Sequence, residues 1–383
     1  IEDLRDLNKA PLCNLHSLNI LEPMTEESYR RLLVLITSPR SPITHLSIMN
    51  SLTCTLITFL SELRFSKSLK SLELQINYYD YELGLALQQI INADILTSLS
   101  VIFLKSVSEM RVKFSPFEAV DILNLKKIKC VRNPKEWIDG IIKSLNIESL
   151  EEFHLLNSDL SVNQCTNINE LLSKHTKLKS LTINDCNVAT SIKVPESTVF
   201  LDLGYNLINN NIFEQLVDSL LPLKNNFSVN LEGNIINDMC LPKLMGLLKS
   251  NRNCYNLNMA NNLVPFEFYV DYCQLMNYMK SISELDLSGV AISNTQAITS
   301  FLKNQKNVKT LRVANCSLVD EELYTFVKIF AIENSNLISY IDISGNKITK
   351  ESKLNSTMNM FVFRKELETI IMKDTLHIED AKK

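Results

Sequence analysis

Glycine and proline are scarce in this sequence, and positive charge is not in excess. It contains 7 glycines and 10 prolines in 383 residues, while 45% of its residues are hydrophobic and 21% are charged. This balance excludes a disordered chain and supplies enough apolar material for a large core. The net charge is −4 at pH 7. Because the chain lacks the basic surplus that neutralises phosphates, nucleic acid is not expected as a main partner.

Long apolar runs and paired cysteines are also missing. No run of apolar residues approaches the roughly 18 that suggest a membrane span, so none is predicted. The nine cysteines are an odd number, and no two are separated by only two residues. This spacing indicates neither a disulfide framework nor a zinc knuckle. A reducing compartment is therefore expected.

The residues that usually carry catalysis form no recognisable group. No glycine-rich phosphate loop of the Walker or Rossmann type occurs. None of the histidines forms an H-x-x-x-H pair, and surface or edge positions are expected for all five, which are His16, His45, His154, His175 and His377. Cysteine–histidine catalysis would need an activated thiolate, but the repeat described next accounts for Cys186 and Cys316. No enzymatic activity, cofactor or metal site is predicted.

Short segments of one shape recur along the chain. Examples are LKSLEL at Leu69–Leu74, LKSLTI at Leu178–Ile183 and VKTLRV at Val308–Val313. The second apolar residue of each segment, here called the anchor, recurs at a mean spacing near 27 residues. The fourteen anchors are Leu18, Leu46, Leu72, Leu99, Ile128, Phe153, Leu181, Leu201, Val229, Leu257, Leu285, Leu311, Ile341 and Ile370. Fourteen regular turns predict a repeat protein.

An asparagine or a cysteine often follows five residues after the anchor. Eight turns have one, at Asn77, Asn133, Cys186, Asn206, Asn234, Asn262, Cys316 and Asn346. The pattern is L-x-x-L-x-L-x-x-[N/C]-x-L, the leucine-rich-repeat motif. As the chain leaves the strand it turns inward and buries backbone polar groups, which an Asn amide or a small Cys can satisfy or accommodate.

Helical segments are expected between the strands. The predicted helices include Glu26–Ile36, Ile57–Leu63, Glu136–Leu145, Ile212–Leu221, Thr295–Leu302 and Glu321–Phe330. Alternating strands and helices predict right-handed parallel crossovers. Strands spaced about 4.8 Å apart and helices about 10 Å wide would bend the array, with a concave parallel sheet and helices on the convex side.

Periods of 28 to 29 residues with a helix in each turn resemble the ribonuclease-inhibitor type of leucine-rich repeat, over residues 15–372. The resemblance implies an α/β solenoid of about 14 repeats, a horseshoe that clasps other proteins. One continuous domain is predicted, with an N-terminal cap at 1–14 and a polar tail at 373–383. The turn between Leu181 and Leu201 has only 20 residues and contains Pro195. It is predicted to lack a helix near 182–200.

Side chains that flank the anchors should point away from the core, because strand side chains alternate. In the C-terminal half these candidate protein-binding residues are Phe200, Asp202, Tyr205, Glu232, Glu284, Asp286, Arg312, Tyr340 and Asp342. Acidic residues predominate, so a basic partner surface could be steered to them. Tyr and Phe beside charges are plausible anchor points. The face turns basic around Lys126, Lys127 and Lys129. The alternative is that these are solvated strand residues without a partner.

The segments Leu285–Gly289 (LDLSG), Leu311–Cys316 (LRVANC) and Ile341–Asn346 (IDISGN) resemble repeats of CARMIL-type actin regulators and of leucine-rich ciliary axoneme subunits. That resemblance implies a cytoplasmic interaction scaffold in a cytoskeletal or ciliary assembly. A second hypothesis is a GTPase-activating protein similar to the Ran regulator, although that family ends in a long acidic tail. A third is a ligase substrate receptor or innate sensor whose adaptor domain would lie outside this sequence.

Overall fold

The computed structural model divides the chain into two compact units, Ile1–Asn187 (unit 1) and Val188–Lys383 (unit 2). The described residues are 15–21, 24–51, 53–76, 81–104, 120–121, 124–133, 135–146, 149–251, 253–264, 283–290, 292, 308–328, 338–347, 349, 359 and 367–374. The predicted cap at 1–14, most of the predicted tail, Asn77, His377 and the predicted helix Thr295–Leu302 lie outside them. The single continuous domain stays a prediction.

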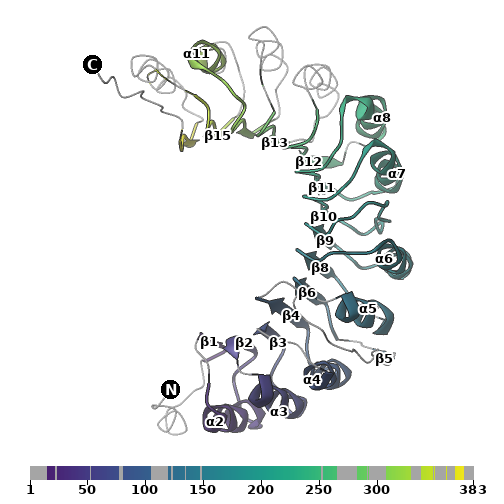
Figure 1. The fold of residues 1–383 in the computed structure, drawn as a ribbon, viewed down its shortest axis with the longest axis vertical. Coiled ribbons are helices and arrows are strands. Elements are labelled where there is room, and N and C mark those ends of the chain that lie inside the picture. The colour runs from purple at the N-terminus through teal and green to yellow at the C-terminus, as the bar shows by residue number, and fades with distance from the viewer. Residues whose placement is uncertain are drawn as a thin grey trace. The chain divides into compact units, whose positions relative to one another are not determined.

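Unit 1 contains a parallel sheet whose strands follow chain order (Figure 1). The strands are β1 (Ser17–Ile20), β2 (His45–Ser51), β3 (Ser71–Ile76), β4 (Ser98–Phe103), β6 (Lys127–Val131), β8 (Glu152–Leu156) and β9 (Ser180–Asn184). Each anchor pairs with the next, from Leu18 opposite Leu46 to Phe153 opposite Leu181. A second, two-stranded parallel sheet joins β5 (Val120–Asp121) to β7 (Leu145–Asn146). The anchor register of unit 1 is confirmed, whereas the small sheet was not predicted.

Unit 2 repeats the same arrangement. Its strands are β10 (Phe200–Asp202), β11 (Phe227–Asn230), β12 (Cys254–Asn258), β13 (Glu284–Asp286), β14 (Thr310–Arg312), β15 (Tyr340–Asp342) and β16 (Thr369–Ile371). The anchors again pair in sequence, from Leu201 opposite Val229 to Ile341 opposite Ile370. The predicted α/β leucine-rich-repeat solenoid is therefore confirmed.

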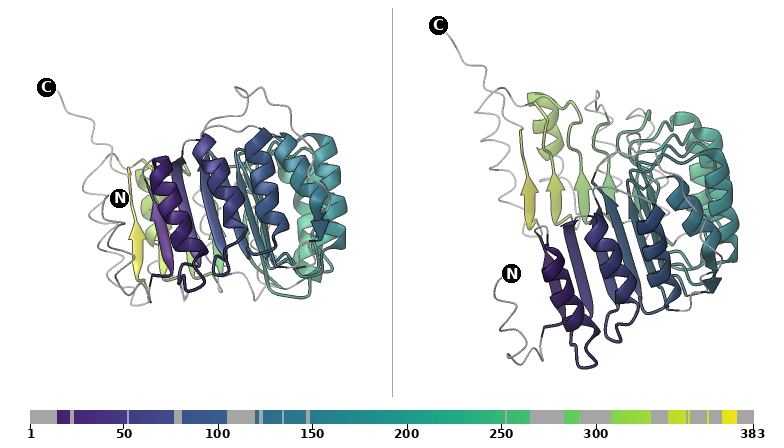
Figure 2. Two further views of the ribbon diagram at one scale, coloured as in Figure 1. Left: turned by 90° about the horizontal axis from the view of Figure 1, so that it is seen from below. Right: turned by 60° about the horizontal axis from the view of Figure 1, so that its bottom comes forward.

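The helices of each unit all lie on one face of its sheet (Figures 1 and 2). Unit 1 contains α2 (Glu26–Thr37), α3 (Thr53–Leu63), α4 (Tyr81–Asn92), α5 (Lys135–Ser144) and α6 (Val162–Lys174). Unit 2 contains α7 (Asn210–Leu220), the short 3-10 helix η2 (Asp238–Cys240), α8 (Leu241–Ser250) and α11 (Asp320–Lys328). The other face of each sheet is thus the side on which the anchor-flanking side chains are found.

Most predicted helices agree with the structure to within a few residues. The helix predicted for Glu26–Ile36 is α2, which begins after Thr25, whose side chain accepts a hydrogen bond from the Ser28 amide. The helix predicted for Glu136–Leu145 ends one residue earlier, because Leu145 belongs to β7. The turn near 182–200 has no helix after β9, as predicted. Its apolar side chains Val188, Ile192 and Val194 are nevertheless buried.

Side-chain amides hold neighbouring repeats together inside the strand-exit turns. Asn234 is 3% exposed, and its Nδ2 donates to the Leu203 and Leu231 carbonyls at 3.0 and 2.9 Å. Its Oδ1 accepts from the Ile208 amide at 3.0 Å. Asn206 and Asn346 make similar sets of bonds. The predicted role of this position is confirmed: these buried polar groups are satisfied by the motif residue itself.

We predict that Asn234→Ala lowers the free energy of unfolding by about 3 kcal/mol, because several buried backbone groups lose their partners together. Gln215→Ala removes an amide from an exposed position on α7 and should change the free energy by less than about 0.5 kcal/mol. Urea unfolding followed by circular dichroism measures both variants. Equal effects of the two substitutions would contradict a structural role for the buried amide.

Candidate protein-interaction surface

The nine predicted binding residues all lie in unit 2, on or just after its strands. Five of them gather on β13, β14 and β15, and this group is called the acidic strip: Glu284, Asp286, Arg312, Tyr340 and Asp342. Tyr205 and Glu232 meet where the chain leaves β10 and β11. Phe200 and Asp202 are both on β10, where the Phe200 side chain is exposed. The predicted residues therefore fall into three sets in the structure: the acidic strip, the contact between Tyr205 and Glu232, and the two residues on β10.

Arg312 lies at the centre of the acidic strip. The strand register places it between Asp286 on β13 and Asp342 on β15. One guanidinium nitrogen, Nη1, is 4.0 Å from Glu284 Oε2, and the guanidinium carbon is 5.2 Å from the centre of the Tyr340 ring. Three carboxylates thus lie at strand positions close to one cation, and the four side chains carry a formal net charge of −2. Such a surface favours a partner with a basic patch.

Asp286 is a carboxylate of the acidic strip whose pKa is raised by its surroundings. Burial raises the pKa of its carboxyl group, whereas the hydrogen bonds from Ser288 and the charge of Arg312 lower it. Glu232 raises it further by charge repulsion. The raised pKa follows from taking a charge out of water with only partial compensation. A cationic side chain from a partner would add the compensation that the unit itself lacks.

The aspartates of the predicted site also have a structural role that was not predicted. Asp202, Asp286 and Asp342 each follow an anchor directly, and each accepts a backbone N–H two residues later at 2.9 to 3.0 Å. Asn230 and Asn258 make the same bond at the same repeat position. One carboxylate oxygen therefore closes the strand-exit turn. The signal was in the sequence, since an Asp or Asn follows the anchor in five of the six repeats from β10 to β15.

Tyr205 adopts a backbone conformation that side-chain-bearing residues avoid. Its φ is +54°, in the left-handed region that favours Gly, Asn and Asp. The fourth residue after the anchor has positive φ in the other repeats of unit 2 as well, where it is Gly, Asn or Asp. A tyrosine at such a position costs on the order of 1 kcal/mol. Because Tyr205 is also 48% exposed, burial does not explain its presence, and its role as a binding residue stays a prediction.

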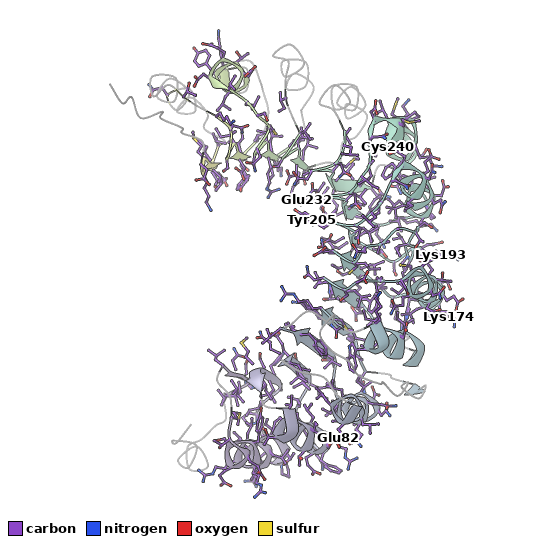
Figure 3. The ribbon with its side chains drawn as sticks, in the orientation of Figure 1. Glu82, Lys174, Lys193, Tyr205, Glu232 and Cys240 are labelled. Carbon is purple, nitrogen blue, oxygen red and sulfur yellow. The ribbon has the colours of Figure 1, made fainter. Side chains whose placement is uncertain are left out.

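The Tyr205 side chain is held in place by its neighbours in the next repeat (Figure 3). Its hydroxyl group donates to Glu232 Oε1. A Cβ atom on Gly233 would lie 2.6 Å from the Tyr205 ring, so the ring packs closely on that glycine. The Glu232 carboxylate raises the pKa of Tyr205 to about 12, with a further contribution from burial. A rigid, exposed aromatic ring loses little conformational freedom on binding.

Glu232 is a positioning residue and not a free carboxylate. Besides the Tyr205 hydroxyl group, it accepts hydrogen bonds from the Asn258 and Asn261 amides at 3.2 and 3.1 Å. These bonds tie three successive repeats together at the strand-exit side of unit 2. Figure 3 shows Tyr205 and Glu232 beside each other on the sheet side, away from Cys240 on the helix side. The predicted role of Glu232 as a direct partner contact stays a prediction.

The three lysines predicted to make the unit 1 face basic are partly neutralised. Lys126 pairs with Glu151 at 3.1 Å, and Lys127 pairs with Glu152 at 2.6 Å. Lys179 also contacts Glu151 at 2.8 Å. The hydrogen bond from Lys179 is the main cause of a lowered Glu151 pKa. The two glutamates offset about half of the positive charge of Lys126, Lys127, Lys129 and Lys179, which makes this face a weaker candidate for an acidic partner.

His154 joins a carboxylate and a hydroxyl group on the same face of unit 1. Its Nδ1 is 2.9 Å from Thr182 Oγ1, and its Nε2 is 3.2 Å from Glu152 Oε2. The sequence of carboxylate, imidazole and hydroxyl group resembles that of a catalytic triad. However, Thr182 is only 5% exposed, so its hydroxyl group is poorly accessible to a substrate. No cluster of three or more potential metal ligands occurs among the described residues. The cluster therefore serves to connect β8 and β9.

The described cysteines and helices add two observations. Burial raises the pKa of the Cys186 and Cys316 thiols to about 12, so neither is an activated nucleophile. Within the described part of the chain, every helix is too short or too polar to span a membrane.

Two solved structures are similar to this chain at low sequence identity. One is a chain of the yeast Rad7–Elc1 complex, with 13% identity and a TM-score of 0.48 over 100% of this chain and 86% of that one. The other is the leucine-rich-repeat-containing protein LegL7 from Legionella pneumophila, with 14% identity and a TM-score of 0.39 over 92% of this chain and 97% of that one. No protein-family model and no curated protein matches the chain.

We predict opposite effects for two glycine-to-alanine substitutions. Gly233→Ala should lower the free energy of unfolding by about 1 to 3 kcal/mol, because φ is +65° there and the new methyl group meets the Tyr205 ring. Gly246→Ala is the matched control: it lies in α8 with open space around it and should stabilise by about 0.5 to 1 kcal/mol. Urea unfolding of both variants tests this. Stabilisation by Gly233→Ala would show that Tyr205 is not held as described.

We predict that unit 1 loses stability in mild acid through His154. Burial lowers the pKa of His154 below its ordinary value of 6.5, and the nearby Lys127 and Lys129 lower it further, while Glu152 opposes them. Because the folded-state pKa is lowered, the contribution is complete above pH 6.5 and is lost as the pH falls through the folded-state pKa. His154→Gln should reduce the fall in unfolding free energy between pH 7.5 and 5.5. An unchanged fall would contradict the assignment.

Proposed function

We propose that this protein is a non-enzymatic interaction scaffold that binds another protein through the sheet face of unit 2. The observation that carries the proposal is the acidic strip, in which three carboxylates lie at strand positions next to Arg312 on the face opposite the helices. Removing water from these carboxylates without supplying a partner cation is unfavourable. Pairing them with lysine or arginine of a partner favours binding and raises the association rate. The favoured partner therefore presents a basic surface.

The aromatic residues supply the apolar part of the same interface. Tyr205 and Phe200 are 48% and 39% exposed on the first repeat of unit 2. Tyr205 is oriented by Glu232, and Tyr340 lies under the Arg312 guanidinium group. Rigid aromatic side chains beside charges are typical of residues that dominate binding energy. They support a protein partner over a small ionic ligand.

We further propose that the partner belongs to a cytoskeletal or ciliary assembly in the cytoplasm. This step rests on the similarity of three repeats, Leu285–Gly289, Leu311–Cys316 and Ile341–Asn346, to those of CARMIL-type and axonemal proteins. The alternatives, a Ran-type GTPase activator and a ligase substrate receptor, predict different partners. Identifying the partner therefore separates the three.

The test removes charge from the acidic strip without removing its turn-closing bonds. In Asp286→Asn/Asp342→Asn, the amide oxygen can still accept the Ser288 and Ser344 N–H groups, as Asn230 and Asn258 do for their own turns. The matched control, Glu196→Gln/Glu214→Gln, removes two exposed charges elsewhere in unit 2. Each tagged chain is purified from the cells that express it, and co-purifying proteins are quantified by mass spectrometry.

We expect a partner at stoichiometric levels with the wild type and the control, and at least about tenfold less with the double variant. Both variants should unfold within about 0.5 kcal/mol of the wild type. Tubulin, actin or axonemal proteins would support the cytoskeletal proposal, whereas a small GTPase or ligase components would replace it. A partner retained equally by the double variant would contradict binding through the acidic strip.

A further inference from the structure

Unit 2 has a second surface feature, separate from the acidic strip. Leu207, Ile235 and Leu263 occupy the same position in three consecutive repeats, six residues after the anchor. They are 45%, 43% and 65% exposed, and the set is here called the exit row. Four described repeats outside these three have polar residues at this position, Asp159 and Asn187 in unit 1 and Ser317 and Lys347 in unit 2, whereas the first repeat has Met24, which is buried. The repeat motif therefore does not require an apolar residue here.

The exit row is held in a fixed stack by the backbone. The Leu207, Ile235 and Leu263 amides donate to the Val188, Ile208 and Ile236 carbonyls at 3.0, 3.1 and 2.9 Å. Asn237 and Leu263 also form an isolated parallel β-bridge. Neighbouring side chains of the row should thus be spaced like residues on adjacent strands, about 4.8 Å apart. Contiguous exposed apolar side chains on a rigid backbone usually mark an interaction surface.

The spacing of the exit row fits a partner helix. Side chains at i, i+3 or i+4 and i+7 of an α-helix advance about 5 Å per step along its axis. A helix lying across the repeats can therefore place one apolar side chain on each residue of the row. Alternate side chains of an extended strand advance about 6.6 Å, so a strand would drift out of step by the third residue.

The charges beside the exit row are acidic. Glu232 precedes Ile235 by three residues, and the exposed Asp238 follows it by three. Between Leu203 and Cys240 the only basic residue is Lys224, at the strand-entry end after α7. Met239, which is 75% exposed next to Asp238, adds an adaptable apolar side chain at the margin. A basic helix is therefore favoured over an acidic one.

We propose that the exit row is a docking site for an amphipathic helix of a partner protein, with apolar residues at i, i+4 and i+7 flanked by lysine or arginine. This site goes beyond the proposed function, because it does not use the acidic strip. A chain with both surfaces can contact two segments of one partner, or two partners at once. Binding at two sites raises the effective affinity without any new contact.

The test uses a synthetic fluorescent peptide of leucine and lysine with leucines at i, i+4, i+7 and i+11. Two control peptides are needed: one has the same composition with the leucines dispersed around the helix, and one has glutamate in place of lysine. Binding to the full chain is measured by fluorescence anisotropy. The variant is Leu207→Gln/Ile235→Gln/Leu263→Gln. The matched control, Leu221→Gln/Val319→Gln, changes two exposed apolar residues elsewhere in unit 2.

We expect the triple variant to weaken binding of the amphipathic basic peptide at least about tenfold, and the control variant to change it less than about twofold. Both control peptides should bind at least about tenfold more weakly than the amphipathic basic one. Asp286→Asn/Asp342→Asn should leave peptide binding unchanged, which separates this site from the acidic strip. Equal binding by the wild type and the triple variant would overturn the proposal. So would sedimentation showing that the wild type self-associates and the triple variant does not, because the occupant would then be a second copy.

Discussion

The structure depends on one interaction that recurs in its strand-exit turns. In each case a buried side-chain amide forms hydrogen bonds with backbone groups of its own repeat and of the preceding repeat. Asn234 satisfies carbonyl groups of its own repeat and of the preceding one, and it accepts the Ile208 amide. Without it, a backbone turn buried beneath the sheet would leave polar groups unpaired. Because each amide binds across the repeat boundary, it fixes the path of successive turns relative to one another. Three features follow because each turn takes the same backbone path. They are the pairing of the anchors, the positive φ of the fourth residue after the anchor, and the direction of the side chains that flank the anchors.

The repeated path also explains where this chain departs from the motif. The left-handed position accepts Gly or Asn at little cost, and side chains there lean over the glycine of the next repeat, as Asn261 does over Gly289 and Asn315 over Gly345. Tyr205 takes that position with a larger side chain, and Glu232 holds its hydroxyl group. The acidic strip arises in the same way, since register alone brings Asp286, Arg312 and Asp342 side by side. Both features belong to this sequence and not to the repeat.

Much of the fold could be predicted because the motif is periodic: the anchors, their pairing and the helix-free turn near 182–200 all follow from spacing. The two-residue strands β5 and β7 could not, because they are too short to show any periodicity. The sequence predicted the site as a set of outward-pointing residues, but it did not predict the hydrogen bonds between them. Sequence places Tyr205 and Glu232 27 residues apart, and their contact follows only once the left-handed turn directs one side chain to the next repeat. The second role of Asp286, closing its own turn, requires the backbone geometry of that turn.

We propose that this protein binds its partner through the sheet side of unit 2. Amide hydrogen exchange of the full chain, alone and with its purified partner, tests this claim most directly because it reports on every repeat at once. We expect the partner to slow exchange in the segments that leave β10 to β15, including those around Tyr205 and Ser288, with little change in α7, α8 and α11. Slower exchange in those helices with no change in the strand-exit segments would contradict it.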